Sequence, residues 1–153
     1  IHRRTTALEI LEDLAQVDIF VCAVGTGGTL TGVAEVLKQK NSNTRVIAVE
    51  PADSAVLSGG KPGLHKIQGI GAGFVPKVLN TGLFDEIMAV TSEESYSASR
   101  MLARKEGILA GISSGANLHA CLRAAEKYPG KNIATIFPDT GERYISTELF
   151  DIF

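Results

Sequence analysis

The stretch DIFVCAVGTGGT, residues 18–29, decides the fold of this chain. Residues 18–24 form an apolar run of strand length, which is typical of a strand covered on both faces. The glycines that follow allow a sharp turn, and the helix predicted after them leaves its first N–H groups unpaired and directed toward that turn. Such a turn favours an anion, most naturally a phosphate. The predicted site consists of Gly25, Thr26, Gly27, Gly28 and Thr29.

Strands and helices alternate along the rest of the chain. Helical spacing predicts helices over residues 6–15, from the glycine turn to Lys40, from Thr91 to Gly107, and from residues 111–115 to about Tyr128. Apolar runs predict strands over residues 45–50, 86–90, 108–110 and 132–137. This alternation predicts an α/β fold, an open, doubly wound, mostly parallel sheet with helices on both faces. Residues 1–153 are expected to form one such domain.

The periodicity disappears between Pro51 and Asn80. Glycines and prolines are dense there: Gly59, Gly60, Pro62, Gly63, Gly69, Gly71, Gly73 and Pro76. A long loop inside a compact domain is more often functional than idle, so we expect it to contribute to a site.

The composition excludes several classes of function. The chain has 153 residues, 44% of them hydrophobic and 21% charged, and its formal net charge is −2. Lysine and arginine form no basic face, which argues against nucleic acid as a partner. No segment approaches the roughly 20 apolar residues of a membrane span. Cys22 and Cys121 lack metal-ligand spacing, so we expect no metal site and two reduced core thiols in a cytoplasmic protein.

Three phosphate ligands compete for the first glycine turn. A dinucleotide fingerprint requires G-x-G-x-x-G; Gly25 and Gly27 match it, but Leu30 occupies the third glycine position. Glu50 stands where a ribose-binding acid would lie, so this alternative stays open. A nucleoside-triphosphate loop is excluded because no G-K-[ST] follows. Pyridoxal phosphate, with its single phosphate, fits a short turn without the third glycine.

A plain structural turn is the alternative to any ligand site, and the first turn alone does not separate the two. A second turn of the same kind, GISSG at residues 111–115, carries small hydroxyls at its apex. Turns that follow parallel strands gather at the carboxyl edge of an open sheet. The two turns are therefore predicted to contact different parts of one small molecule.

Four motifs occur in a specific order: GTGGT at 25–29, KPGLHKIQGIGAGF at 61–74, GISSGA at 111–116 and GERY at 141–144. Together they resemble the cysteine synthase, or O-acetylserine sulfhydrylase, family over essentially the whole chain. The resemblance implies the tryptophan-synthase-β-like fold of type II pyridoxal-phosphate enzymes. The chain resembles the carboxyl-terminal, cofactor-binding half of that family.

The resemblance also implies roles for particular residues. The cofactor would be pyridoxal 5'-phosphate, its phosphate bound by the first glycine turn and its pyridine nitrogen contacted by Ser113. Ser114 is the alternative to Ser113, although its hydroxyl could equally cap the helix. Gly69, Gly71 and Gly73 would form a flexible loop on the substrate side of the site.

The family reaction releases acetate from O-acetyl-L-serine, and sulfide then adds to form L-cysteine. The Schiff-base lysine of the family has no counterpart among the lysines of this chain. We therefore expect a fragment that starts at Ile1, lacks the amino-terminal half, contains no catalytic residue, binds the cofactor weakly and is inactive alone. The intact protein is expected to be a homodimer.

A partner is implied for the loop that carries Lys61, His65 and Lys66. In plant relatives this loop contacts serine acetyltransferase, whose carboxyl-terminal tail enters the active site. Three solvated basic groups are the alternative interpretation of the same residues.

Other functions stay open at this point. A cystathionine β-synthase is the nearest alternative, although the motifs at 61–69 and 141–144 favour cysteine synthase. A dinucleotide-binding oxidoreductase domain and a non-catalytic relative that binds a partner's tail are the others. Asp139 departs from the small residue common at its position, and a carboxylate facing the pyridine nitrogen would weaken the role given to Ser113.

Overall fold

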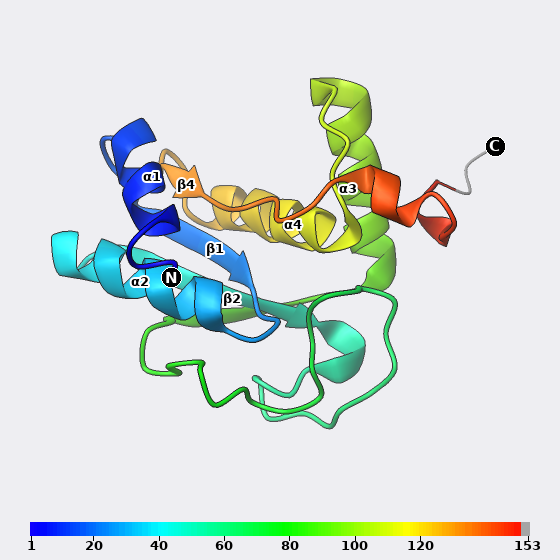
Figure 1. The fold of residues 1–153 in the computed structure, drawn as a ribbon, viewed down its shortest axis with the longest axis horizontal. Helices are drawn as coiled ribbons and strands as arrows, with labels where there is room; N and C mark the ends of the chain where they lie inside the picture. The colour runs from blue at the N-terminus through cyan, green and yellow to red at the C-terminus, as the bar shows by residue number, and fades with distance from the viewer. Residues whose placement is uncertain (151–153) are drawn as a thin grey trace.

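Four parallel strands form the centre of the molecule (Figure 1). The computed structural model describes residues 1–150. Its strands are β1 (Ile19–Ala23), β2 (Arg45–Pro51), β3 (Glu86–Val90) and β4 (Ile133–Ala134). The strand order is β3-β2-β1-β4, and every neighbouring pair is parallel. The strand that precedes the first glycine turn therefore lies in the interior of the sheet.

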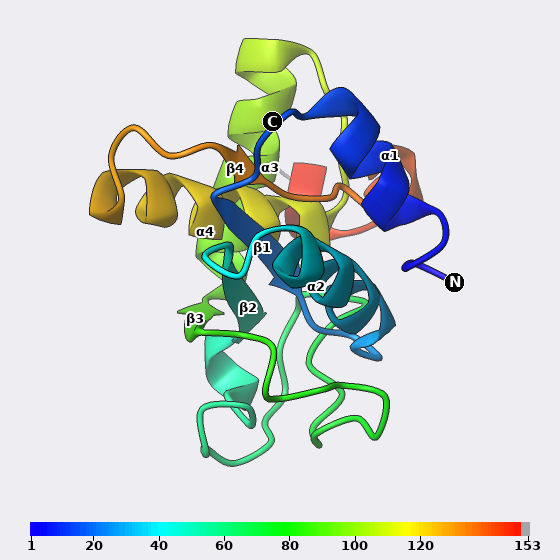
Figure 2. The same ribbon diagram turned by 90° about the vertical axis from the view of Figure 1, so that its left-hand side faces the viewer.

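Helices cover both faces of this sheet (Figure 2). The helices are α1 (Thr6–Asp13), α2 (Gly28–Lys40), α3 (Ser92–Glu106) and α4 (Ile112–Lys127), with short 3-10 turns at Ala52–Ser54, Gly141–Tyr144 and Glu148–Phe150. α1 and α2 lie on one side of the sheet, whereas α4 lies on the other side and packs against α3. This arrangement confirms the predicted open α/β sheet with helices on both faces.

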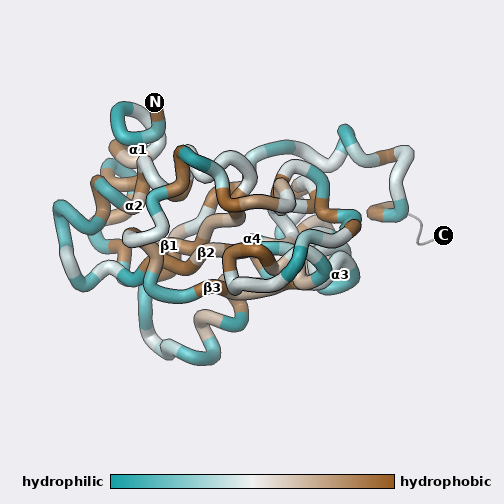
Figure 3. Tube along the Cα trace, turned by 90° about the horizontal axis from the view of Figure 1, so that it is seen from below, coloured by the Kyte–Doolittle hydropathy of each residue, from teal (hydrophilic) through white to brown (hydrophobic). Residues whose placement is uncertain are grey.

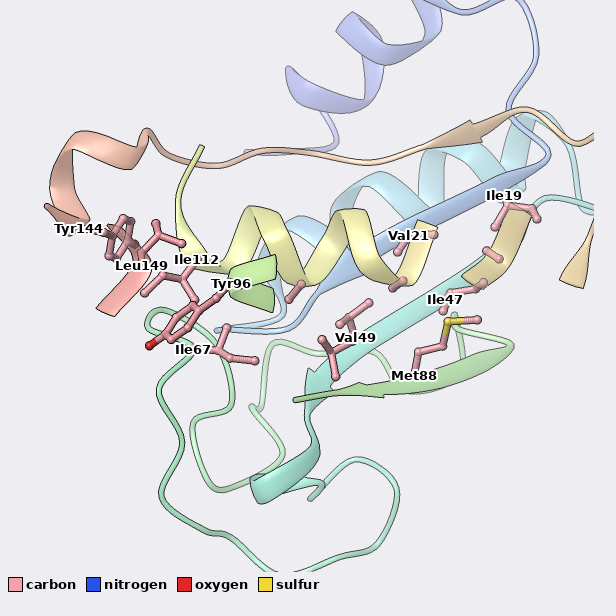
Figure 4. Packing of buried hydrophobic residues seen from close by; sticks show 14 residues of the cluster. Ile19, Val21, Ile47, Val49, Ile67, Met88, Tyr96, Ile112, Tyr144 and Leu149 are labelled. Atoms are coloured by element: carbon pink, nitrogen blue, oxygen red, sulfur yellow. The ribbon is translucent and has the colours of Figure 1, made fainter. Parts of the chain in front are cut away.

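The strands bury side chains on both faces, because successive residues of a strand point in opposite directions. The core on the α4 side includes Ile19, Val21, Ile47, Val49, Ile112, Ala116 and Ala120 (Figure 4). The core on the α2 side includes Phe20, Cys22, Val46, Ala48, Leu30, Val33 and Leu37. The hydrophobic colour in Figure 3 follows the strands accordingly. The run at 18–24 is apolar throughout because both of its faces are covered.

The glycine-rich region after β2 is irregular, as predicted. Residues 55–85 form neither helix nor strand. Glu50, only 2% exposed at the end of β2, fixes the start of this region. Its carboxylate accepts hydrogen bonds from the N–H groups of Leu57 at 2.7 Å and Ser58 at 3.0 Å, and from the Ser58 hydroxyl. A buried carboxylate thus attaches the loop to the sheet.

The strand predicted over residues 108–110 is wrong. Within the described chain this segment makes only an isolated antiparallel bridge, between Ala110 and Thr140. The carbonyl oxygen of Ala110 accepts the hydroxyl of Ser99 in α3 at 2.8 Å. Only Ala110 of this run is buried, whereas Ile108 and Leu109 are 46% and 41% exposed. The segment therefore connects α3 to α4 outside the sheet.

The strand predicted over residues 132–137 is shorter in the structure, where β4 contains two residues. Beyond β4, the hydroxyl of Thr135 donates to the carbonyl oxygen of Val21 at 2.8 Å. The amide of Asn117 donates to the carbonyl oxygen of Ile136, also at 2.8 Å. Side chains replace the backbone ladder there, which is why the regular strand ends early.

The sequence contains two capping-box patterns, Thr6-x-x-Glu9 and Thr91-x-x-Glu94, which predict helix starts, and their outcomes differ. In α3, Thr91 accepts the N–H of Glu94 at 3.2 Å and the Glu94 carboxylate accepts the N–H of Thr91 at 2.8 Å, which confirms the box. In α1 the predicted box is wrong, because Thr6 is already inside the helix and its hydroxyl is hydrogen-bonded to His2 at 2.8 Å.

Both cysteines have free thiols. Burial raises the pKa of Cys22 to about 12 and that of Cys121 to about 11, so both thiols stay protonated at neutral pH. Residues 1–150 contain no group of three or more histidine, cysteine or acidic side chains suited to a metal ion. In the same residues, each helix is too short or too polar to cross a membrane.

Asn117 of α4 joins β1 to the segment after β4. Its side chain is almost completely buried, and its Oδ1 accepts the N–H of Ala23 at 2.7 Å. Its Nδ2 donates to the carbonyl oxygen of Ile136. Both backbone groups lie where the parallel ladder stops, so one amide side chain completes the hydrogen bonding at this edge of the sheet.

We expect the Asn117→Leu variant to lower the free energy of unfolding by about 2–4 kcal/mol, because it leaves two buried backbone groups unpaired. Urea denaturation followed by circular dichroism measures this change. The matched control is Asn43→Ala, at an exposed turn, which should change stability by less than about 0.5 kcal/mol. Equal stability of the two variants would contradict the structural role of Asn117.

Candidate functional site

A cavity of about 660 Å³ opens at the carboxyl end of β1, a size typical of small-molecule sites. Its walls come from five distant segments: the chain start, the end of β1 with the first glycine turn, the loop at residues 68–70, the start of α4 and the region after β4. The lining residues are His2, Thr6, Cys22, Ala23, Gly25, Thr26, Gly27, Thr29, Leu30, Gln68, Gly69, Ile70, Ser113, Asn117, Ile136, Phe137, Pro138, Asp139, Arg143 and Tyr144. The two turns expected to meet at one sheet edge both contribute to this cavity.

The first glycine turn presents a row of unpaired N–H groups. α2 begins at Gly28, and the first hydrogen bond of its ladder runs from the N–H of Thr31 to the carbonyl oxygen of Gly27 at 3.0 Å. Within residues 1–150, the N–H groups of residues 25–30 donate to no protein acceptor. Neighbouring donors at the positive end of a helix dipole favour an anion. The turn therefore fits a phosphate group.

Two glycines of this turn leave no room for a side chain. A Cβ on Gly25 would lie 2.5 Å from the carbonyl oxygen of Gly69, and a Cβ on Gly27 would lie 2.7 Å from the Cβ of Leu79. Gly27 also has a φ of +82°, which residues with side chains rarely adopt. Bare backbone thus faces both the cavity and the glycine-rich loop. Gly28, in contrast, starts the helix without lining the cavity.

His2 contributes to the site although it belongs to none of the four sequence motifs. Its Nδ1 is hydrogen-bonded to the hydroxyl of Thr6 at 2.8 Å, and its Nε2 to the hydroxyl of Thr29 at 3.2 Å. The ring therefore connects α1 to the first glycine turn. No sequence signal marks this contact, because its two partners stand 4 and 27 residues away.

The start of α4 places one of its two serines at the cavity. Ser113 lies in the first turn of the helix, is 5% exposed and lines the cavity. Ser114 is fully buried outside the cavity wall, and its hydroxyl has no partner within the described residues. Of the two candidates, Ser113 is the one whose position suits a ligand contact.

Asp139 reaches the same cavity from the region after β4. Its Oδ2 accepts the hydroxyl of Tyr144 at 2.5 Å, and its Oδ1 is buried without a partner in residues 1–150. A Cβ on Gly111 would overlap that Oδ1, so the carboxylate lies against the start of α4. Burial, and then the Asp139 carboxylate, raise the pKa of Tyr144 to about 12. The phenol therefore stays a hydrogen-bond donor at neutral pH.

The predicted substrate-side glycines lie beside the first glycine turn. Gly69 lines the cavity, whereas Gly71 and Gly73 lie outside its wall. The N–H of Gly71 donates to the carbonyl oxygen of Val24 at 3.1 Å, which attaches the loop to the end of β1.

The three predicted partner-binding residues lie away from the cavity. Lys66 donates to the Glu148 carboxylate at 2.5 and 2.7 Å, and the ring of His65 is hydrogen-bonded to the carbonyl oxygen of Gly71 at 3.1 Å. Lys61 is exposed and makes no hydrogen bond or ion pair within residues 1–150. Two of the three basic groups therefore have partners inside the chain.

The structure argues against a dinucleotide site, because Glu50 is not available to bind a ribose. The carboxylate of Glu50 is occupied by Leu57 and Ser58 and lines no part of the cavity. Leu30, at the position of the third fingerprint glycine, is almost completely buried in the core on the α2 side. Neither residue suits a ribose or a close helix–strand approach.

The fold and the cavity define an α/β protein with an anion site at the start of a helix. A family model described as "Pyridoxal-phosphate dependent enzyme" matches residues 2–139, so the chain belongs to the pyridoxal-phosphate dependent enzyme family. The predicted cofactor is confirmed for the family, and the row of N–H groups at residues 25–30 fits its phosphate.

Individual relatives show which members of the family this chain is similar to. Cysteine synthase B of Campylobacter jejuni is 51% identical over 150 residues, covering 97% of this chain and 50% of the relative. The structure of O-acetyl serine sulfhydrylase isoform 3 from Entamoeba histolytica has a TM-score of 0.94 at 48% identity, covering 97% of this chain and 45% of that chain. The structure of the O-acetylserine dependent cystathionine beta-synthase from Helicobacter pylori has a TM-score of 0.92 at 40% identity. The match covers 97% of this chain and 49% of that chain. The predicted resemblance is confirmed, and the chain spans about half the length of these relatives.

We expect Tyr144 to ionise with a midpoint near pH 12, measured by the phenolate absorbance in a rapid pH jump. Its pKa in the folded protein lies above the ordinary value of about 10. The stability that it contributes is therefore present below pH 10 and is lost as the pH rises from 10 to 12. The Tyr144→Phe variant should lack this component of the titration.

Two further variants separate the causes of the raised pKa of Tyr144. Asp139→Asn removes the negative charge beside the phenol, so the midpoint should fall but stay above the ordinary value, because burial is the larger cause. Tyr128→Phe should leave the Tyr144 component in place. A midpoint of Tyr144 that does not respond to Asp139→Asn would contradict the contact between the two residues.

Proposed function

We propose that this chain is the cofactor-phosphate half of a cysteine synthase, which makes L-cysteine from O-acetyl-L-serine and sulfide. The observation that carries the proposal is the row of unpaired N–H groups at residues 25–30, facing a cavity with Ser113 on its wall. Membership of the pyridoxal-phosphate dependent enzyme family gives this anion site its ligand. Relatives named cysteine synthase match the chain over almost its whole length.

The first glycine turn would bind the cofactor phosphate through its N–H groups and the hydroxyls of Thr26 and Thr29. Hydrogen bonds to a charged group contribute about 1.5–3 kcal/mol each, and a partly buried helix terminus adds up to about 2 kcal/mol. His2 holds the hydroxyl of Thr29 in place. The phosphate would therefore supply much of the cofactor affinity.

Ser113 would contact the pyridine nitrogen at the other end of the ring. A carboxylate partner would keep that nitrogen protonated, whereas a hydroxyl leaves it largely neutral. The neutral partner suits elimination and replacement at Cβ. When bound, pyridoxal phosphate supplies the electron-withdrawing ring through which an amino acid exchanges a group at Cβ.

The contribution of this chain is orientation. The phosphate site and Ser113 lie at the starts of α2 and α4, two helices packed on opposite faces of one sheet. Rigid elements hold such contacts more precisely than loops do. The loop with Gly69, Gly71 and Gly73 would cover the substrate side and limit the entry of water.

The rest of the enzyme would come from an amino-terminal half that carries the Schiff-base lysine. The homodimer and the cytoplasmic location stay predictions. Contact with a serine acetyltransferase tail also stays a prediction for the loop with Lys61, His65 and Lys66. Lys61, whose side chain is exposed and makes no ion pair within residues 1–150, is the basic group that this loop would offer to a partner.

Cystathionine β-synthase is the second candidate, favoured by the similarity to the Helicobacter pylori structure. The two enzymes differ in the acceptor thiol, so the decisive comparison is sulfide against homocysteine. The burial of Leu30 and the engagement of Glu50 argue against a dinucleotide-binding oxidoreductase.

The function is tested with the complete protein that contains this chain. We expect cysteine formation from O-acetyl-L-serine and sulfide, with pyridoxal phosphate bound. We also expect Gly25→Ala to weaken cofactor binding about tenfold or more, since its Cβ would displace the carbonyl oxygen of Gly69. Fluorescence titration of the cofactor-free protein measures the affinity.

The matched control for that variant is Gly82→Ala, at an exposed position where a Cβ meets only the Asn80 side chain at 3.4 Å. It should bind the cofactor as the unchanged protein does. A non-catalytic relative would bind a peptide tail and form no cysteine. Product formation with homocysteine alone would assign the protein to the second candidate.

We expect the isolated chain to form no cysteine and to bind pyridoxal phosphate weakly, because no lysine in it matches the Schiff-base position. Borohydride reduction after addition of the cofactor, followed by peptide mass mapping, measures lysine labelling. Sparse labelling spread over several lysines is the expected result. Stoichiometric labelling of one lysine would refute the assignment of catalysis to the other half.

A further inference from the structure

The imidazole of His65 is attached to the glycine-rich loop. Its Nε2 lies 3.1 Å from the carbonyl oxygen of Gly71. Because a carbonyl only accepts, Nε2 carries the hydrogen and donates it. Its Nδ1 is buried and has no partner within residues 1–150. The ring is therefore partly buried and hydrogen-bonded to the loop through Nε2.

The backbone that carries His65 is itself fixed. Ile67, two residues on, is fully buried in the core on the α4 side. The N–H of Lys66 donates to the hydroxyl of Ser92 at 3.2 Å, and the Lys66 ammonium pairs with Glu148. His65 thus stands on a segment anchored to α3, the core and the region after α4.

Gly71 is held from both sides. Its N–H donates to the carbonyl oxygen of Val24, and its own carbonyl accepts from His65. Its φ is +65°, and a Cβ there would lie 2.5 Å from Pro51 Cγ and 2.8 Å from His65 Nε2. Gly71 is therefore held through both its N–H and its carbonyl group, whereas a Cβ on Gly69 would meet no atom within 4 Å.

The position of Gly71 determines how the loop lies on the first glycine turn. The carbonyl oxygen of Gly69, two residues away, lies 2.5 Å from the position that a Cβ of Gly25 would take. We propose that His65 is a positioning residue, whose Nε2–H holds Gly71 so that the loop rests against the first glycine turn on the substrate side. The effect on substrate rests on the proposed function, whereas the attachment of the loop does not.

The experiment uses the complete protein and compares His65→Phe, which keeps a planar ring without the donor, with His65→Gln, whose amide N–H reaches a similar position. Hydrogen exchange of residues 69–73 reports the attachment. For His65→Phe we expect exchange at Gly71 to rise about tenfold, the KM for O-acetyl-L-serine to rise several-fold, and kcat to change little. His65→Gln should restore both quantities substantially.

Leu64→Ala is the matched control, because Leu64 adjoins His65 and is fully exposed. It should leave exchange and KM unchanged. Unchanged exchange at Gly71 in His65→Phe would overturn the proposal, as would an equal rise throughout β1 and α4. Should His65→Phe fail to fold, Gly71→Ala, whose Cβ displaces the ring, must reproduce the fast exchange with the high KM. If the proposed function is wrong, the protein without any substitution forms no cysteine. The hydrogen-exchange comparison then still tests the attachment of the loop.

Discussion

The close approach of two backbones, at Gly25 and Gly69, is the constraint on which the site depends. It leaves no space for a Cβ, and it places the glycine-rich loop directly on the turn that carries the unpaired N–H groups. The bond from Gly71 to Val24 continues the contact into β1. Sheet, turn and loop therefore form one unit. Because the loop keeps water from part of the turn, the N–H groups interact more strongly with an anion than they would in bulk solvent.

Buried polar side chains in this protein mainly satisfy its backbone. Asn117 pairs with β1 and with the segment after β4, Glu50 with the start of the irregular region, and Ser99 with the segment before α4. Each bonds a backbone group that no regular ladder pairs, and a buried backbone group without a partner is costly. These side chains allow the sheet to end in irregular segments at the very edge where the cavity needs exposed donors. A few amide, carboxylate and hydroxyl side chains thus pair the backbone groups that the regular structure leaves unpaired beside the open site.

Local patterns predicted the parts of the structure that local physics determines. The apolar run at 18–24, the glycine turn and the capping box at Thr91 depend on neighbours within a few residues, and the structure has all three. The segment 108–110 shows the limit, because its apolar pattern predicts a buried strand, whereas Ile108 and Leu109 are largely exposed and only Ala110 is buried. His2 shows the same limit for the site, since its ring matters only once α1 has packed beside the first glycine turn.

The carboxylate of Asp139 and the hydroxyl of Ser113 line the same cavity, but their surroundings differ. Asp139 lies against the start of α4, where the helix dipole favours a negative charge. Tyr144, whose pKa is raised, remains protonated and donates to one of its oxygens. Helix and phenol together stabilise the carboxylate without a ligand. Ser113 lies in the first turn of the same helix and has no such partner within residues 1–150. A ring nitrogen placed against Ser113 would therefore meet a neutral hydroxyl, even though a carboxylate lies in the same cavity wall.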